Sequence, residues 1–110
     1  MNFEEIEDLK LIQDFALREN FFRIKSGLSA RELSLRLGKH PSYINALEAK
    51  GFAMPITIVY KMIRELGVTT EQFFADDYKN YNKNNEIYNL IKNMSEASKD
   101  SVLAIIKNMK

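Results

Sequence analysis

The chain has 110 residues, of which 45% are hydrophobic and 28% charged, and its formal net charge is +1. A chain of this length can bury one core without staples, and the lack of cysteine excludes disulfides, thiolate metal ligands and a cysteine nucleophile. No apolar run approaches the roughly 20 residues that span a bilayer, and the acidic start of the chain is unlike a secretory signal. We therefore expect a cytoplasmic protein.

The charge is distributed unevenly along the chain. Residues 14–52 carry seven Arg and Lys against four acids, whereas residues 1–13 carry one Lys against four acids. The central segment is therefore locally basic, which is a weak indication of nucleic-acid binding.

Glycines and capping signals predict five helices before residue 78. Gly27, Gly38, Gly51 and Gly67 each follow a helix-forming stretch, and Ser29–Glu32 and Thr69–Gln72 read as capping boxes. The predicted helices cover residues 14–25, 30–37, 41–49, 55–66 and 70–75, and an amphipathic extension from Phe3 can precede the first. The fourth is expected to bury Ile56, Val59, Ile63 and Leu66, and the fifth Phe73 or Phe74. No segment alternates as a strand does, so we predict an all-α fold.

The C-terminal part predicts a linker and two more helices. Residues 78–85 are rich in Tyr, Asn and Lys and read as a polar linker. Apolar residues then recur at helical spacing over residues 86–110: Ile87, Leu90, Ile91, Met94, Val102, Ile105, Ile106 and Met109. With Ser95 as an N-cap, this pattern predicts a helical hairpin. Its apolar stripes are candidates for a dimer surface, and the alternative is that they fold back onto the preceding domain.

Residues 28–48 form the most informative segment. They predict two short helices joined by a tight glycine turn, with Leu33 and Leu37 facing inward from the first and Ile44 and Leu47 from the second. This packing leaves the N-terminal residues of the second helix pointing outward. A helix presented in this way fits the major groove of DNA, which is about 12 Å wide.

The segment resembles the phage-repressor (Xre, Cro/C1-type) family of helix-turn-helix transcriptional regulators, and the resemblance continues through Gly67–Phe74. It implies a compact five-helix DNA-binding domain over residues 14–77, after an N-terminal extension of residues 1–13. The family's Leu-Arg and Ile-Glu pairs correspond to Phe22-Arg23 and Leu47-Glu48, which implies a structural ion pair between Arg23 and Glu48. A first-helix position that is usually apolar in the family corresponds to Glu19, which predicts different packing there.

Candidate DNA contacts follow from the resemblance and from residue chemistry. The family's main base-reading positions correspond to Pro41, Ser42 and Ala46, and a common phosphate-contacting Gln corresponds to Ala30. We expect Ser42 and Asn45 to contact base edges, because Asn can pair bidentately with adenine. The expected phosphate contacts lie at the turn and the helix ends: Ser29, Ala30, Arg31, Lys39, His40, Tyr43 and Lys50.

These features predict a DNA-binding transcriptional regulator in the role of a repressor. A homodimer would read a palindromic operator through the helix at 41–49, because two modules related by a two-fold axis read half-sites about 34 Å apart. The alternative is a protein-interaction or antitoxin-type module on the same scaffold, with weak or lost base readout. No enzyme, cofactor or metal site is expected, because the single histidine has no second His or Cys to join it.

Overall fold

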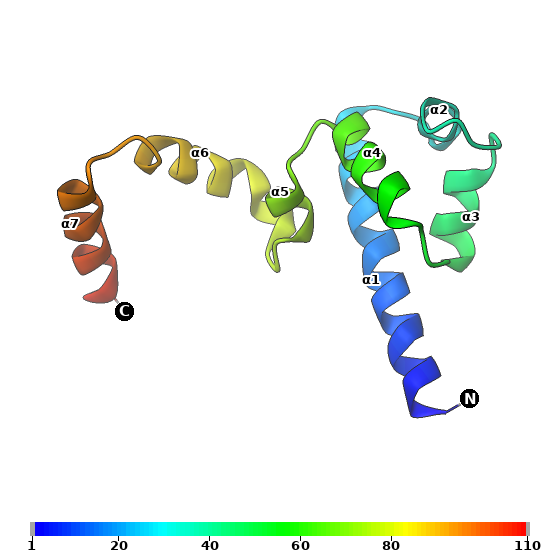
Figure 1. Ribbon diagram of the computed structural model, residues 1–110, viewed down its shortest axis with the longest axis horizontal. Helices are drawn as coiled ribbons and strands as arrows, with labels where there is room; N and C mark the ends of the chain where they lie inside the picture. Colours follow the sequence, from blue (N-terminus) through cyan, green and yellow to red (C-terminus); the bar gives the residue numbers. More distant parts are fainter. Residues whose placement is uncertain (1, 110) are drawn as a thin grey trace. The chain divides into compact units, whose positions relative to one another are not determined.

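The computed structural model describes residues 2–109 and divides into two compact units, residues 1–79 and 80–110. The described residues hold seven α-helices, one short 3₁₀-helix and no strand, so the expected all-α fold is confirmed (Figure 1). The first unit contains five of the helices: α1 Phe3–Ser26, α2 Ala30–Arg36, α3 Tyr43–Lys50, α4 Ile56–Leu66 and α5 Thr70–Phe74.

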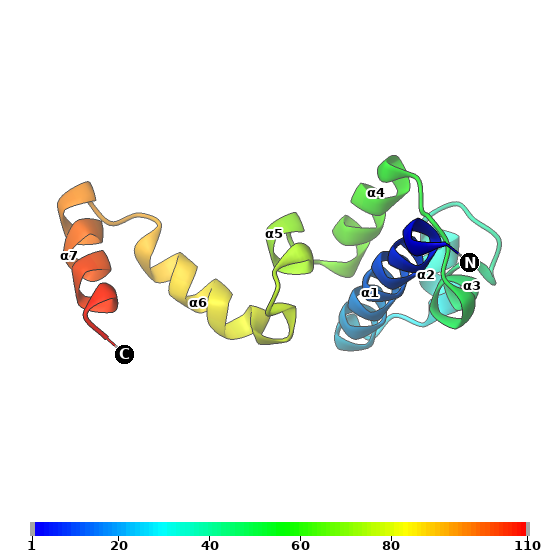
Figure 2. The ribbon, with the colours of Figure 1, turned by 90° about the horizontal axis from the view of Figure 1, so that it is seen from below.

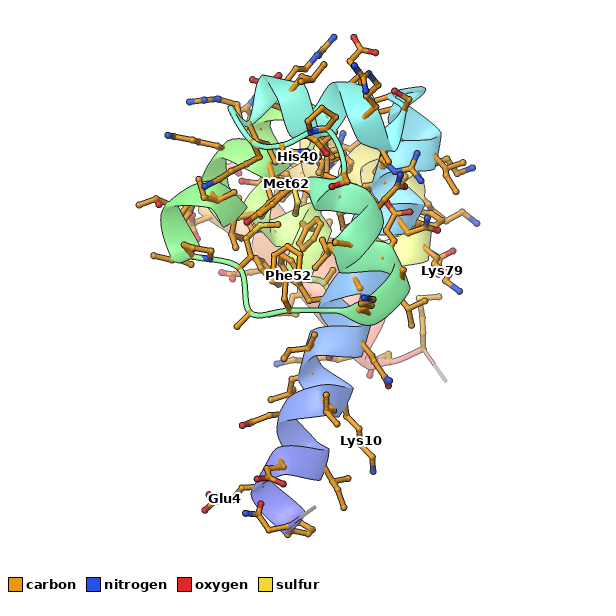
Figure 3. All side chains as sticks on the ribbon, turned by 90° about the vertical axis from the view of Figure 1, so that its right-hand side faces the viewer. Glu4, Lys10, His40, Phe52, Met62 and Lys79 are labelled. Atoms are coloured by element: carbon orange, nitrogen blue, oxygen red, sulfur yellow. The ribbon has the colours of Figure 1, made fainter. Side chains whose placement is uncertain are left out.

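The first helix includes the extension that the sequence allowed. α1 runs unbroken from Phe3 to Ser26, so the amphipathic segment from Phe3 and the helix expected over residues 14–25 form one helix. It begins with a capping box in which the Asn2 side chain accepts the Glu5 N–H at 2.9 Å and Glu5 accepts the Asn2 N–H at 3.1 Å. The N-terminal half of α1 extends past the other helices of this unit, as Figure 3 shows at Glu4 and Lys10.

An apolar core forms where α3, α4 and α5 pack against α1 and where α2 packs against α3 and α4. Its fully buried large side chains include Phe22, Leu33, Ile44, Leu47, Met62 and Phe73. Leu33, Leu37, Ile44 and Leu47 are thus inward, as expected of a helix-turn-helix. At the edge of the core, Arg18 Nη1 donates to the carbonyl oxygens of Phe73 at 2.9 Å and Ala75 at 2.6 Å. These bonds tie α1 to the end of α5.

Two local predictions were wrong. Ile56 is 65% exposed, whereas Val59, Ile63 and Leu66 are buried as predicted, and α4 also buries Ile58 and Met62. The prediction placed one residue per helical turn on the buried face. A helix that packs against several neighbours buries two adjacent residues in each turn. α3 begins at Tyr43, so Pro41 lies in the preceding turn and not in the first helical turn. Of the two candidates in α5, Phe73 is buried and Phe74 is 51% exposed.

Position 51, which ends α3, requires a glycine, both because of its backbone conformation and because of a neighbouring side chain. Its φ of 75° and ψ of 147° lie in a region that residues with a Cβ rarely adopt, and a Cβ there would lie 2.6 Å from Cγ2 of Ile12. We expect Gly51→Ala to lower the free energy of unfolding by about 3 kcal/mol. Gly27→Ala is the matched control: its φ is also positive, but a Cβ would meet nothing within 4 Å. It should cost only about 1 kcal/mol, and equal losses in urea unfolding would contradict the steric argument.

The second unit contains α6 Tyr81–Ile91 and α7 Glu96–Lys107, after a 3₁₀ turn at Tyr78–Asn80. Residues 78–85, which were predicted as a polar linker, contain this turn and the start of α6, and the boundary between the two units lies within them. The Ser95 side chain accepts the Ser98 N–H at 3.1 Å and caps α7 as expected. α6 and α7 do not lie side by side (Figures 1 and 2), and neither helix contains a buried residue. Both predicted helices are present. Of their apolar residues, Ile91, Met94 and Val102 are half-buried, whereas the others are exposed: Ile87, Leu90, Ile105, Ile106 and Met109.

Candidate nucleic-acid interface

The turn between α2 and α3 is held by backbone bonds and by one buried serine. Gly38, with a φ of 70°, lets the chain reverse, and the N–H of Lys39 donates to the Ser34 carbonyl at 3.0 Å. The Ser34 hydroxyl donates to the Ala30 carbonyl at 2.7 Å and accepts the Ile44 N–H at 3.0 Å. Ser34 thus joins α2 to the first turn of α3 and was missed by sequence reasoning. Its position among the inward-facing leucines of α2 was the available signal.

The N-terminal part of α3 presents the predicted base-reading residues to solvent. Ser42, Asn45 and Ala46 are exposed, and Pro41 is half-buried beside them. Positions i, i+3 and i+4 share one face of a helix, so Ser42, Asn45 and Ala46 form one continuous surface. His40 lies at the turn that leads into this surface (Figure 3).

Tyr43 links this surface to the core. Its ring packs on Phe52 with centroids 5.0 Å apart, and the ammonium of Lys39 lies 5.5 Å from the Tyr43 ring centroid. Burial raises the pKa of Tyr43, so its hydroxyl keeps its proton. The side chain can therefore donate a hydrogen bond to an anionic oxygen.

The residues predicted to contact phosphates differ in whether their side chains already form hydrogen bonds or ion pairs within the domain. Ser29 caps α2 by accepting the Glu32 N–H at 3.0 Å. Arg31 and Lys50 are exposed, Lys39 is half-buried, and none of the three joins an ion pair among residues 2–109. By contrast, Arg36 pairs with Glu32 at 2.9 Å and with Glu65 at 3.6 Å. The three cations that the sequence assigned to phosphates are therefore not neutralised by an ion pair within residues 2–109.

The structure brings Arg23 of α1 and Glu48 of α3 together. Arg23 Nε lies 2.7 Å from Glu48 Oε2, and Nη2 lies 2.8 Å from Oε1, which is a bidentate pair. Asn20 Nδ2 also donates to Glu48 Oε1 at 2.8 Å, and Arg23 Nη1 donates to the Leu28 carbonyl at 3.1 Å. This cluster fixes the C-terminal half of α3 to α1 and thereby sets the direction in which α3 points.

A second carboxyl group, that of Glu19, lies next to this pair. Glu19 is fully buried, and neither of its oxygens accepts a hydrogen bond from the described residues. Burial, together with the neighbouring Glu48 carboxyl group, raises the pKa of Glu19 to about 9, against the opposing charge of Arg23 at 3.6 Å. Glu19 is therefore a neutral acid in the folded protein. Although burial works against it, hydrogen bonds from Arg23 and Asn20 lower the pKa of Glu48 to about 2.

Comparisons with known proteins identify the domain. A family model described as Helix-turn-helix matches residues 22–73, a segment that contains α2 to α4 and both Arg23 and Glu48. The comparisons with curated proteins and with solved structures gave no match. No helix within residues 2–109 has the length and hydropathy needed to cross a membrane. Residues 22–73 are a non-enzymatic, DNA-binding helix-turn-helix domain of the Cro/C1-type (Xre) family, which regulates transcription.

Proposed function

We propose that this chain is a cytoplasmic repressor that binds a palindromic operator as a homodimer and reads it through the exposed face of α3. The observation that carries the proposal is that face itself. Ser42, Asn45 and Ala46 are exposed together at the N-terminal part of a helix whose other end is fixed to α1 by the bidentate Arg23–Glu48 pair. Held in this way, α3 can enter a major groove without losing its own packing.

Base reading rests mainly on Asn45 and Ser42. An exposed asparagine can pair bidentately with N6 and N7 of adenine, and a serine hydroxyl can bond to one base edge. The methyl group of Ala46 suits contact with the thymine methyl, and Pro41 borders the same surface. Two of the four side chains offer hydrogen bonds, so a single module carries few specific contacts.

Phosphate contacts supply most of the affinity in this proposal. Arg31, Lys39 and Lys50 are cations without ion-pair partners among residues 2–109, and Tyr43 and His40 can each donate a hydrogen bond. Ser29 and the backbone N–H groups of Ala30 and Arg31 at the start of α2 complete the set. Such contacts position the protein on the duplex and carry no direct sequence information.

Dimerisation through the second unit would double this limited readout. Leu90 is 72% exposed, and Ile87, Ile105 and Ile106 are also exposed on helices that have no buried residue, as is Met109 just after α7. Apolar faces of this kind are usually covered by a partner. A second copy is the occupant we propose, because two modules related by a two-fold axis read two half-sites.

The test is selection of binding sites from a random duplex pool, followed by titration of the enriched site at several salt concentrations. We expect a two-fold symmetric site. Asn45→Ala should then lose about 1–3 kcal/mol of discrimination at one base pair. Lys39→Ala should weaken all duplexes alike by about 3- to 10-fold and reduce the salt slope by about 0.9.

Matched controls are available outside the interface. Asn93→Ala removes an exposed asparagine from the loop after α6, and Lys10→Ala removes an exposed lysine from the protruding part of α1. Both should bind as the wild-type chain does. If nothing is enriched and binding stays weak at low salt, the operator proposal fails. The helix-turn-helix would then serve as a scaffold for a protein partner, as in an antitoxin-type module.

A further inference from the structure

His40 and Ser42 form a two-bond contact at the entrance to α3. The Ser42 N–H donates to His40 Nδ1 at 3.1 Å, and Ser42 Oγ lies 2.7 Å from the same nitrogen. Both residues are exposed (Figure 3 labels His40), so the contact lies on the surface proposed to face DNA. The Tyr43 N–H donates to the His40 carbonyl at 2.9 Å. His40 therefore caps the turn that starts the recognition helix, as an Asn or Ser would elsewhere.

The geometry of this contact fixes the direction of the hydroxyl proton. A backbone N–H can donate only to a ring nitrogen that carries a lone pair, so Nδ1 is unprotonated and the imidazole proton is on Nε2. An oxygen 2.7 Å from an unprotonated Nδ1 must supply the hydrogen itself. The Ser42 hydroxyl therefore donates its only proton to His40.

Ser42 makes no other use of its hydroxyl that would change this result. It occupies the position before α3, yet its side chain forms no capping hydrogen bond to the helix. Both lone pairs of Oγ therefore remain available on the exposed side, with no proton left to offer. Taken alone, serine discriminates poorly between bases because it can donate or accept.

We infer that His40 is a positioning residue that turns Ser42 into a hydrogen-bond acceptor, so that Ser42 selects adenine or cytosine at the base it meets. In the major groove, adenine N6 and cytosine N4 are donors, whereas guanine and thymine offer only acceptors at the corresponding edge. This inference rests on the proposed function, in which the N-terminal part of α3 enters that groove. It adds that Ser42 accepts a hydrogen bond from the base, which the residue type of Ser42 alone does not determine.

The experiment measures base preference at one position of the selected operator. Ser42→Ala identifies the base pair at which discrimination is lost, and that pair is then varied through all four bases. The wild-type chain should prefer adenine or cytosine over guanine or thymine by about 5-fold. His40→Ala frees the hydroxyl proton and should reduce the preference to below about 2-fold.

A conservative variant separates positioning from folding. His40→Asn places an amide oxygen near the position of Nδ1, where it can accept the same two hydrogens, so it should keep most of the preference. Thermal unfolding of all three variants checks that the domain remains intact. An unchanged preference in His40→Ala, or a wild-type preference for guanine or thymine, overturns the inference and leaves the proposed function standing.

Two further outcomes are decisive. If a site is selected but no base pair responds to Ser42→Ala, the inference falls alone; if no site is selected, the proposed function falls with it.

The protonation of His40 can also be read without DNA, because it is the only histidine of the chain. The nitrogen shifts of the neutral imidazole should show an unprotonated Nδ1, and a protonated Nδ1 overturns the inference directly.

Discussion

Glu19→Gln should raise the free energy of unfolding at pH 7 by about 3 kcal/mol. The reason is that folding raises the pKa of Glu19 from 4.5 to about 9, mainly by burial. Below pH 4.5 both the folded and the unfolded chain hold the proton, and Glu19 costs nothing. Above it the unfolded chain releases the proton while the folded chain keeps it, so stability falls with pH up to about 9.

The measurement is urea unfolding at pH 5, 7 and 8.5 for the wild-type chain, Glu19→Gln and Glu19→Leu. Both variants should match the wild type near pH 5 and exceed it increasingly at higher pH, because neither side chain ionises. Glu32→Gln is the matched control: Glu32 is an exposed glutamate that pairs with Arg36, also exposed, and its loss should change stability by less than about 0.5 kcal/mol. Parallel pH curves for Glu19→Gln and the wild type would show that Glu19 is ionised in the fold.

The sequence identified Glu19 as unusual but did not predict the protonation state of its carboxyl group. Its place in a helix position usually filled by an apolar residue predicted unusual packing, and the structure puts the side chain in the core. Its protonation depends first on burial and then on Glu48, and both result from the packing of α1 with α3 and the other helices. A charge state that arises from two distant carboxyl groups has no signature in local spacing.

Helix positions were predicted better than their ends and their faces. Capping signals located α2, α5 and α7, because a cap is a local property of a few residues. The Asn2–Glu5 box that starts α1 was overlooked, although it has the same spacing. The buried face of α4 was displaced toward Ile56, since which neighbour covers a helix is a property of the assembled core.

Some features of the candidate interface could be predicted from the sequence, and others could not. The residue chemistry of Ser42, Asn45 and the cations was readable from the sequence, because exposed polar residues beside a helix-turn-helix suggest contacts by type alone. The His40–Ser42 contact and the Ser34 bridge were not, because each depends on the geometry of the turn. Two helices were predicted over residues 86–110, and the second unit contains α6 and α7, because helical spacing of apolar residues is a local signal.

Arg23→Met should lower the free energy of unfolding by about 3 kcal/mol. The substitution leaves the Glu48 carboxylate half-buried, with Asn20 as its remaining side-chain hydrogen-bond donor among residues 2–109. Glu48→Met should cost a similar amount, because it strands the guanidinium of Arg23 in the same place. The loss should be absent at acid pH: folding lowers the pKa of Glu48 to about 2, so its stabilisation is present above pH 4.5 and disappears as the pH falls toward 2.

The double variant decides how Arg23 and Glu48 stabilise the fold: by neutralising each other's charge, or by the separate contacts that each makes with other residues. When both partners become apolar, no charge remains unpaired, so Arg23→Met with Glu48→Met should cost only about 1–2 kcal/mol, well below the sum of the single losses. The exposed pair of Arg36 and Glu32 is the control, and its cycle should show a coupling below about 0.5 kcal/mol. Additive losses at Arg23 and Glu48 would mean that each side chain stabilises the fold alone, through Leu28 and Asn20. A strong coupling would instead make the pair the joint between α1 and α3, so that its loss loosens the helix proposed to read DNA.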